Sequence, residues 1–312
     1  MAAFRSVLEL IGNTPLVEVT QLNPTPGVRI LVKLEGQNPG GSVKDRIALA
    51  MVEEAESAGR LRPGQTILEP SSGNTGIGLA LVCRLRGYRL RVVLPENVSV
   101  ERRQLLEIFG AEIVFSPAAE GSNGAVRLAQ RLAKEDDQVA FLYQYGNPAN
   151  PGAHYRSTGP EIWRDCPEVT HFVSGLGTSG TLMGVGRYLK ERNPSVQVWA
   201  VEPPSGELVQ GLRNLDDGFV PEVFDAEVLD RKLIVRPRES IEWTRRLTFE
   251  AGIFAGISGG AAMAGAARAA SEVDEGVVVT VLADGGWKYL STGVWTDDLD
   301  EVVERASQIV YF

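Results

Sequence analysis

Residues 65–94 read QTILEPSSGNTGIGLALVCRLRGYRLRVVL, and this stretch decides the fold. A short run rich in β-formers (65–69) leads through a polar glycine loop into an apolar helical stretch (76–86), and a second β-branched run (90–94) follows. The same alternation of short strands and longer helices recurs along the chain. It predicts an α/β protein with mostly parallel, doubly wound sheets.

Eight strands and six helices are predicted from this alternation. The strands are expected at 29–34, 65–69, 90–94, 112–115, 140–142, 171–174, 196–201 and 277–282, and the helices at 45–58, 76–86, 99–109, 125–134, 181–192 and 260–272. Because 312 residues are long for one such sheet, we expect two α/β domains with a cleft between them. The turn-forming stretch 146–151 favours a boundary between residues 1–146 and 147–312.

The composition excludes several classes of function. The net charge is −9 with no basic stripe, which argues against nucleic acid. The beginning lacks a signal-peptide pattern and no apolar run approaches the length of a membrane span, so we expect a cytoplasmic protein without membrane contact. Two cysteines and two histidines without ligand spacing predict no metal site and no Ser-His-Asp chemistry. Difficult chemistry would therefore fall to a cofactor.

In parallel α/β sheets, ligands bind at the loops that lead from strands into helices. The loop 70–76, Pro-Ser-Ser-Gly-Asn-Thr-Gly, combines small residues with hydroxyl and amide side chains, which favours a carboxylate at the helix N-terminus over a simple cap. The loop 174–181, Ser-Gly-Leu-Gly-Thr-Ser-Gly-Thr, lacks the spacing of a dinucleotide motif and suits one compact phosphate. A third loop, 256–261, is either part of a ligand-binding site or a turn that allows close helix packing.

Lys44 stands in Gly40-Gly41-Ser42-Val43-Lys44-Asp45-Arg46, at the expected start of a helix. The positive end of the helix dipole disfavours an ammonium there and favours the neutral amine that Schiff-base chemistry requires. The alternative is an ordinary surface lysine.

Taken together, these four segments resemble the fold type II pyridoxal-phosphate enzymes, and more closely the cysteine synthases, from Ile11–Leu16 to Lys288–Gly293. The resemblance implies a pyridoxal 5′-phosphate enzyme that forms L-cysteine by β-replacement through an α-aminoacrylate intermediate. It implies Lys44 as the Schiff-base lysine and catalytic base, and Ser258 at the pyridine nitrogen. The other cofactor-binding residues would be Asn74, Gly177, Thr178, Ser179, Gly180 and Thr181, and the substrate-binding residues Ser71, Ser72, Thr75 and Gln144.

The resemblance also implies a homodimer, a crossing of part of residues 9–35 to the other domain, and a mobile subdomain at about 87–132. Around Arg213 and in 101–106, 143–150 and 284–289 the chain resembles the cysteine synthase B subgroup of actinobacteria. That subgroup uses O-phospho-L-serine and a thiocarboxylated sulfur-carrier protein. Arginine suits a dianionic phosphate, so Arg213 is a candidate for binding it.

Several alternatives stay open at this point. Arg213 could instead form a surface ion pair with Asp216 or Asp217, and the enzyme could be an O-acetylserine sulfhydrylase using sulfide. The chain could also be a non-catalytic binding protein on the same scaffold. Asp284 either tunes the cofactor ring or caps a turn, and the apolar end Gln308–Phe312 either closes the cleft or supports a subunit interface.

Overall fold

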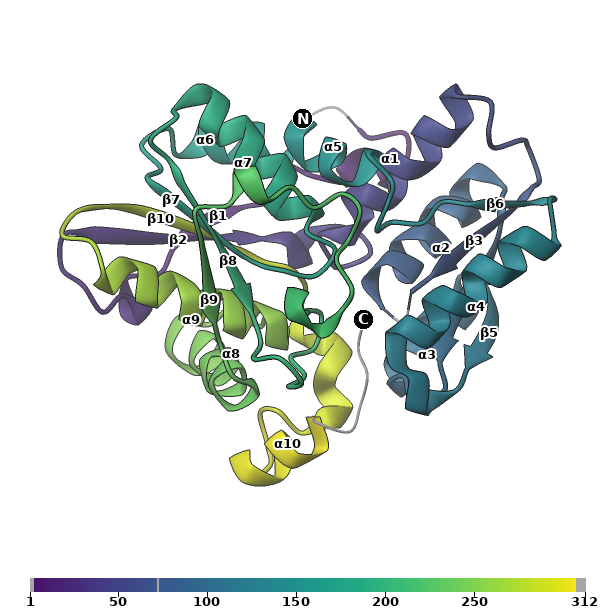
Figure 1. Ribbon diagram of the computed structural model, residues 1–312. Coiled ribbons are helices and arrows are strands. Elements are labelled where there is room, and N and C mark those ends of the chain that lie inside the picture. Colours follow the sequence, from purple (N-terminus) through teal and green to yellow (C-terminus); the bar gives the residue numbers. More distant parts are fainter. Residues whose placement is uncertain (1–2, 72, 307–312) are drawn as a thin grey trace.

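The computed structural model of the protein describes residues 3–71 and 73–306, and it consists of two lobes, each built on its own sheet (Figure 1). The strand order is β1-β2-β10-β7-β8-β9 in the larger sheet and β5-β4-β3-β6 in the smaller. Neighbouring strands are parallel throughout, except for the antiparallel pair β1–β2. The predicted α/β architecture with mostly parallel sheets is confirmed.

The larger sheet contains β1 (Leu16–Glu18), β2 (Val28–Leu34), β7 (His171–Gly175), β8 (Gln197–Glu202), β9 (Arg231–Ile234) and β10 (Gly276–Leu282). The smaller contains β3 (Thr66–Pro70), β4 (Arg89–Pro95), β5 (Glu112–Ser116) and β6 (Val139–Phe141). The helices are α1 (Lys44–Ser57), α2 (Asn74–Arg86), α3 (Val100–Ile108), α4 (Gly121–Glu135), α5 (Ala149–Arg156), α6 (Thr158–Asp165), α7 (Gly180–Arg192), α8 (Pro237–Ala251), α9 (Ile257–Ser271) and α10 (Leu299–Ala306). Short 3-10 helices include η3 (Glu35–Gln37), η5 (Leu215–Asp217) and η7 (Gly286–Thr292).

Each predicted strand and helix corresponds to one of these elements, with ends shifted by a few residues. Two strands, β1 and β9, and four helices, α5, α6, α8 and α10, were not predicted. The turn-forming stretch 146–151 does not remain a loop, because α5 begins at Ala149. Pro151 fits there, since a proline in the first helical turn removes an N–H that has no intrahelical acceptor.

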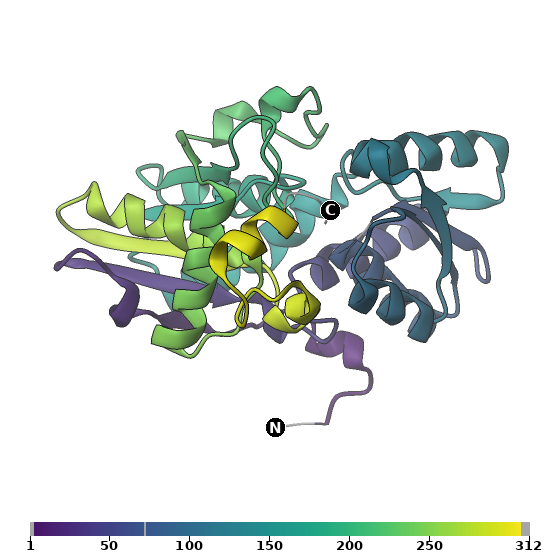
Figure 2. The same ribbon diagram turned by 90° about the horizontal axis from the view of Figure 1, so that it is seen from below.

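Helices cover both faces of each sheet. In the larger lobe α6 and α7 lie on one face and α8 and α9 on the other, and the two lobes remain side by side when viewed from below (Figures 1 and 2). In the smaller lobe α1, α2 and α3 pack on one face and α4 on the other. Strands covered on both faces need mostly apolar sequence, which explains Gly-Val-Val-Val-Thr-Val-Leu in β10 and Val-Arg-Ile-Leu-Val-Lys-Leu in β2, where Arg29 is exposed and Lys33 is paired with Glu161.

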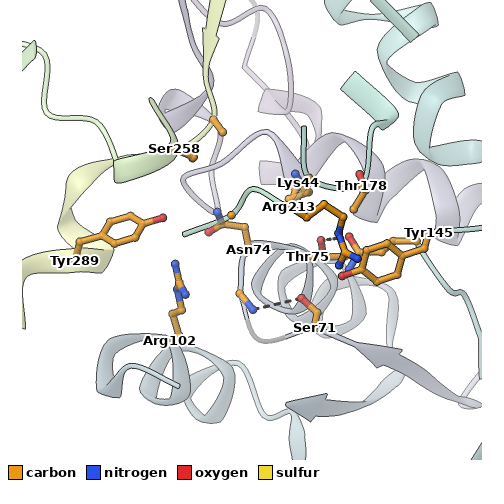
Figure 3. A pocket seen from close by; sticks show the side chains of 15 residues that line it. Lys44, Ser71, Asn74, Thr75, Arg102, Tyr145, Thr178, Arg213, Ser258 and Tyr289 are labelled. Carbon is orange, nitrogen blue, oxygen red and sulfur yellow. Dashed lines mark hydrogen bonds between the residues drawn. The ribbon is translucent and has the colours of Figure 1, made fainter. Parts of the chain in front are cut away.

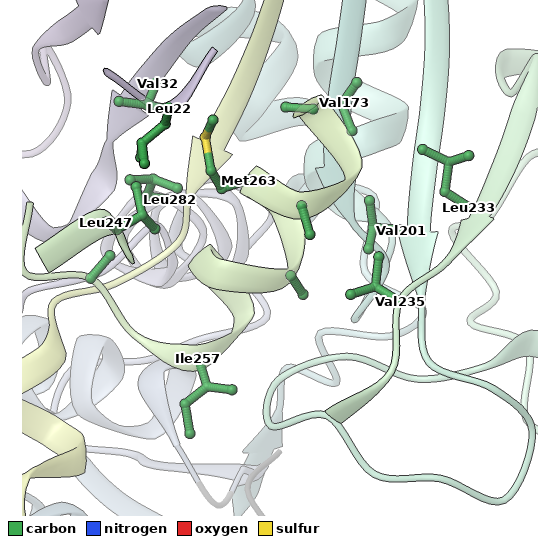
Figure 4. Packing of buried hydrophobic residues seen from close by; sticks show 14 of the residues in the cluster. Leu22, Val32, Val173, Val201, Leu233, Val235, Leu247, Ile257, Met263 and Leu282 are labelled. Carbon is green, nitrogen blue, oxygen red and sulfur yellow. The ribbon is translucent and has the colours of Figure 1, made fainter. Parts of the chain in front are cut away.

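The central core of the larger lobe forms around α9, a helix of small residues (Figure 4). Two of its glycines allow close approach, because a Cβ on Gly260 would lie 2.2 Å from the Ser240 carbonyl oxygen of α8. A Cβ on Gly265 would lie 2.4 Å from Cγ2 of Val201 on β8. Close helix packing, the simpler of the two interpretations of residues 256–261, is therefore one role of this segment.

A buried ion-pair network ties α1 to the larger lobe. Arg46 donates to both carboxylate oxygens of Glu35 at 2.8 Å, and to those of Glu161 on α6 at 2.7 and 2.8 Å. Lys33 of β2 pairs with Glu161 at 2.7 Å. Because Arg46 lies two residues after Lys44, this network fixes the start of α1 between the two sheets.

Every helix in the described ranges 3–71 and 73–306 is too short or too polar to span a lipid bilayer.

Candidate active site

A pocket opens where the carboxyl ends of both sheets face each other, and Figure 3 shows the side chains that surround it. An adjoining compartment extends under the loop between β7 and α7. The pocket is lined by Lys44, Ser71, Gly73, Asn74, Thr75, Arg102, Gln144, Tyr145, Gly177, Thr178, Gly211, Arg213, Ser258, Ala283 and Tyr289. The compartment adds Ser179, Gly180 and Thr181. The structure thus brings together every predicted site residue that it describes; Ser72 lies outside the described residues.

Lys44 is the first residue of α1, as expected. The segment before it is joined to the end of β10, since Val43 N donates to the Ala283 carbonyl at 2.8 Å and Ser42 forms a β-bridge with Asp284. Burial lowers the pKa of the Lys44 ammonium, against the opposing charges of Asp284 and Glu35. Desolvation is the largest cause of this shift, and it favours a neutral amine.

The first glycine loop joins β3 to α2. The Ser71 hydroxyl oxygen accepts from Gly76 N at 3.0 Å and Gly73 N at 3.4 Å, so Ser71 also caps the start of α2. Thr75 donates to Oε1 of Gln144 at 2.7 Å. These contacts hold side chains from two neighbouring strand ends, β3 and β6, on one wall of the pocket.

Asn74, in the first turn of α2, is fixed from the opposite lobe. Its Nδ2 donates to Asp284 Oδ2 at 2.8 Å, and its Oδ1 accepts from Lys288 Nζ at 2.6 Å. Tyr289 also donates to Asp284 Oδ2, at 2.9 Å. Lys288 is fully buried, and this burial lowers its pKa to about 8. Asp284 therefore orients a pocket-lining amide, which is more than capping the following turn.

The second glycine loop forms a tight turn between β7 and α7. Ser179 has φ +65°, and its hydroxyl donates to the Thr178 carbonyl at 2.6 Å. A Cβ on Gly177 would lie 2.7 Å from the Gly211 carbonyl oxygen, so this position has no room for a side chain. The loop is a small cradle at a helix N-terminus, suited to one phosphate group.

Two further segments complete this side of the pocket. Ser258 lies in the first turn of α9, close to Gly211. Arg213 follows in the loop after β8, where its backbone N donates to the Leu176 carbonyl at 2.8 Å. The Arg213 guanidinium carbon lies 4.3 Å from the ring centre of Phe219 and 5.1 Å from that of Tyr145. These aromatic rings hold a cation at the pocket wall.

Three large side chains of the pocket were missed as site residues: Arg102, Tyr145 and Tyr289. Arg102 lies on α3, and its guanidinium carbon is 5.1 Å from the centre of the Tyr289 ring. Arg102 is buried, whereas Arg103 beside it is exposed and pairs with Glu107. No local pattern distinguishes these two arginines, because the difference comes from packing of α3 across the cleft on η7.

The family assignment follows from a sequence comparison. The pattern of the family described as "Pyridoxal-phosphate dependent enzyme" matches residues 7–284. The chain belongs to this family.

Relatives narrow the assignment to cysteine synthases. "Cysteine synthase B" of Pseudomonas aeruginosa is 43% identical over 293 residues, covering 94% of this chain and 98% of that protein. The solved structure of "O-ureido-L-serine synthase" has a TM-score of 0.89 and 41% identity, covering 94% and 96% of the two chains. That of "Cysteine Synthase (OASS)" from Entamoeba histolytica has a TM-score of 0.89 and 34% identity, covering 98% and 96%. The protein is therefore a pyridoxal-phosphate enzyme catalysing β-replacement of the cysteine synthase type.

The pocket fits the cofactor of this family. A buried amine of lowered pKa and a cradle too narrow for a Cβ at Gly177 lie in adjoining parts of one cavity. An aldehyde with an anionic phosphate tail requires this combination of groups.

Proposed function

We propose that this enzyme forms L-cysteine from O-phospho-L-serine, and that Arg213 binds the phosphate of the substrate. The observation that carries the proposal is a buried guanidinium in the same pocket as Lys44. A charged fork of donors stabilises a dianionic leaving group far more than a neutral acetyl ester. Because Arg213 is held by Tyr145 and Phe219, its position needs little reorganisation on binding.

The residue roles are part of this proposal. Lys44 would hold the cofactor through its Nζ, and the same amine would remove and return the α-proton of the substrate. The loop 177–181 would hold the phosphate of the cofactor, Asn74 would donate to its ring hydroxyl, and Ser258 would contact its pyridine nitrogen. Bound pyridoxal phosphate supplies the electron sink that makes the α-proton removable. Ser71, Ser72, Thr75 and Gln144 bind the substrate carboxylate, with the N-terminus of α2 contributing its N–H groups.

The sulfur donor in this proposal is a thiocarboxylated sulfur-carrier protein or sulfide. A hollow beside the pocket supports entry of a thin polypeptide end, since Arg213 lines both spaces. The hollow continues between Glu120–Asn123 at the start of α4 and Phe219 of the opposite lobe. We further place the enzyme in the cytoplasm as a homodimer.

The domain division at 146/147, with part of residues 9–35 crossing to the other domain, and the mobility of about residues 87–132 belong to the same proposal. Helix α3, inside this segment, reaches η7 across the cleft, where Glu101 Oε1 accepts from Ser291 N at 2.9 Å. This contact lies beside the Arg102–Tyr289 contact. A shift of α3 would therefore open or close the mouth of the pocket.

The second candidate function is an O-acetylserine sulfhydrylase using sulfide. The relative from E. histolytica, described as "Cysteine Synthase (OASS)", favours it.

Stopped-flow absorbance distinguishes the two candidate functions by comparing the reaction rates of the holoenzyme with O-phosphoserine and with O-acetylserine. The Arg213→Ala variant should lose about 2–4 kcal/mol more transition-state stabilisation with O-phosphoserine than with O-acetylserine. Arg187→Ala, which removes a surface arginine paired with Asp225, is the matched control and should leave both rates unchanged. Equal losses with both donors in Arg213→Ala would remove Arg213 from phosphate recognition, and a faster reaction of the wild type with O-acetylserine would favour the second function.

A further inference from the structure

Helix α5 carries two buried polar side chains that contact the second glycine loop from behind. Asn150 and His154 are one helical turn apart, so they lie on the same face of α5. Asn150 Nδ2 donates to the Thr178 hydroxyl oxygen at 3.0 Å, and His154 Nε2 lies 3.3 Å from the Thr181 hydroxyl oxygen. Neither residue lines the pocket.

The close approach of α5 to this loop depends on glycines of α7. A Cβ on Gly180 would lie 1.8 Å from Asn150 Oδ1. A Cβ on Gly184, one turn further along α7, would lie 2.2 Å from the Pro151 carbonyl oxygen and 2.6 Å from His154 Cβ. Two glycines at this spacing let the polar face of α5 reach the loop. Glycine lowers the stability of a helix relative to alanine, so the close contact with α5 offsets this loss.

The direction of the Asn150 hydrogen bond is fixed by its second partner. Asn150 Nδ2 also donates to the Gln144 carbonyl oxygen at 2.9 Å, and a carbonyl can only accept. The amide nitrogen therefore faces Thr178, whose oxygen also accepts from Gly180 N at 3.4 Å. With two donors at its oxygen, the Thr178 hydroxyl directs its own proton away from them.

His154 makes the corresponding contact to Thr181 as a neutral ring. Burial lowers its pKa well below the usual value, and the charges of Arg46 and Lys44 lower it further against Glu161. A neutral imidazole has one donor and one acceptor nitrogen. Its Nδ1 lies 2.9 Å from the hydroxyl oxygen of Thr158, which can donate to it. When Thr158 donates to Nδ1, the ring carries its proton on Nε2, donates it to Thr181 and leaves the Thr181 proton for another acceptor.

We propose that Asn150 and His154 are positioning residues that turn the hydroxyl protons of Thr178 and Thr181 toward the phosphate of the cofactor. The proposal rests on the assignment of the cofactor phosphate to loop 177–181. A phosphate dianion accepts hydrogen bonds only, so a threonine that presents a lone pair to it would repel it. Asn150 and His154 thus determine that the loop presents hydroxyl protons, and not lone pairs, to an anion.

Titrations of the apoenzyme test this inference, because pyridoxal 5′-phosphate and pyridoxal differ only in the phosphate. His154→Leu and Asn150→Leu should each weaken pyridoxal phosphate binding roughly 3- to 10-fold, the effect of one neutral hydrogen bond, and leave pyridoxal binding unchanged. His154→Gln, whose amide nitrogen can replace Nε2, should restore most of the affinity. His171→Gln, at the distant start of β7, is the matched control.

Thr178→Val and Thr181→Val distinguish phosphate binding by the loop hydroxyls from the positioning role of Asn150 and His154. If these variants lose affinity for pyridoxal phosphate while both leucine variants keep it, the loop binds phosphate and the positioning role is wrong. If the threonine variants also bind normally, the two hydroxyls do not contact the phosphate and the positioning proposal fails, while binding of the phosphate by the backbone N–H groups of the loop is unaffected.

The tautomer of His154 can be measured with His154 itself unsubstituted, which avoids any effect of its replacement on folding. The chain has two histidines, so ¹⁵N-labelled histidine gives two ring systems that His171→Gln assigns. We expect His154 in the holoenzyme to carry its proton on Nε2 and the ³¹P resonance of the cofactor to shift in His154→Leu. A proton on Nδ1, or an unchanged ³¹P resonance, would overturn the proposal.

Discussion

Nζ of Lys288 donates a hydrogen bond of 2.6 Å to Oδ1 of Asn74, joining residues 214 positions apart in the chain. Because Oδ1 receives the ammonium, Nδ2 must face Asp284, and one N–H of Asn74 remains for the pocket. The orientation of this amide is thus decided by the opposite lobe.

Replacing Lys288 should release this amide. We expect Lys288→Met to lower kcat/KM roughly 10- to 100-fold, since a small displacement of a positioning group costs this much in rate. Lys288→Arg should keep most activity because it retains donors, and Lys190→Met, at a partly exposed pair with Asp230, should have no effect. Steady-state kinetics of the three variants would contradict this role if Lys288→Met remained as active as the wild type.

Glu69 should make stability depend on pH. It is fully buried at the end of β3, and burial raises its pKa from 4.5 to about 8. Between these values the folded state keeps a proton that the unfolded state releases, so stability falls as pH rises through the window, by about 1.4 kcal/mol per pH unit at the steepest. Urea unfolding should show that Glu69→Gln removes this slope.

Glu54→Gln on the surface of α1 is the control for this measurement and should leave the slope as in the wild type. A wild-type slope that persists in Glu69→Gln would show that another group causes it.

The ion-pair network of Arg46 should be essential for stability. Arg46→Met leaves the carboxylates of Glu35 and Glu161 buried with reduced compensation, and we expect a loss of about 3–5 kcal/mol in the free energy of unfolding. Arg60→Ala breaks an exposed pair with Glu54 and should cost below about 1 kcal/mol. Chemical denaturation measures both, and similar losses in the two variants would argue against a special role for the buried network.

The contact between α3 and η7 should control opening of the cleft. Glu101→Ala removes the carboxylate that accepts from Ser291 N. A hydrogen bond to a charged group contributes about 1.5–3 kcal/mol, so exchange of the Ser291 amide should become roughly 10- to 100-fold faster. Hydrogen exchange with Glu107→Ala as the control on the same helix tests this, and unchanged protection of Ser291 would mean that the contact does not hold the cleft.

Much of the fold could be predicted because the strands of a doubly covered sheet require mostly apolar residues. The missed elements lack such a signal. Two of the buried residues of α8, Ser240 and Thr244, are polar, which weakens its apolar period. Helix α5 contains Asn, Pro and Gly, and its buried face includes Asn150 and His154, which make polar contacts with a distant loop.

The site could be predicted where function imposes a local pattern and not where packing decides. The glycine loops need their residues side by side, so they are visible in the sequence. Arg102 and Tyr289 enter the same pocket only because α3 and η7 meet across the cleft. The end of the chain, for which cleft closure and a subunit interface were both considered, lies outside the described residues.

The pairing of β2 with β10 has a consequence for synthesis of the protein on the ribosome. β2 emerges early, but its parallel neighbour β10 is among the last strands to be made. Until β10 has been made, one edge of the apolar strand β2 is unpaired, and Val43 N lacks its hydrogen-bond acceptor, the Ala283 carbonyl. Through most of its elongation the nascent chain therefore has an unpaired strand edge that can pair with other chains. Lys44 gains its final surroundings only when translation is nearly complete.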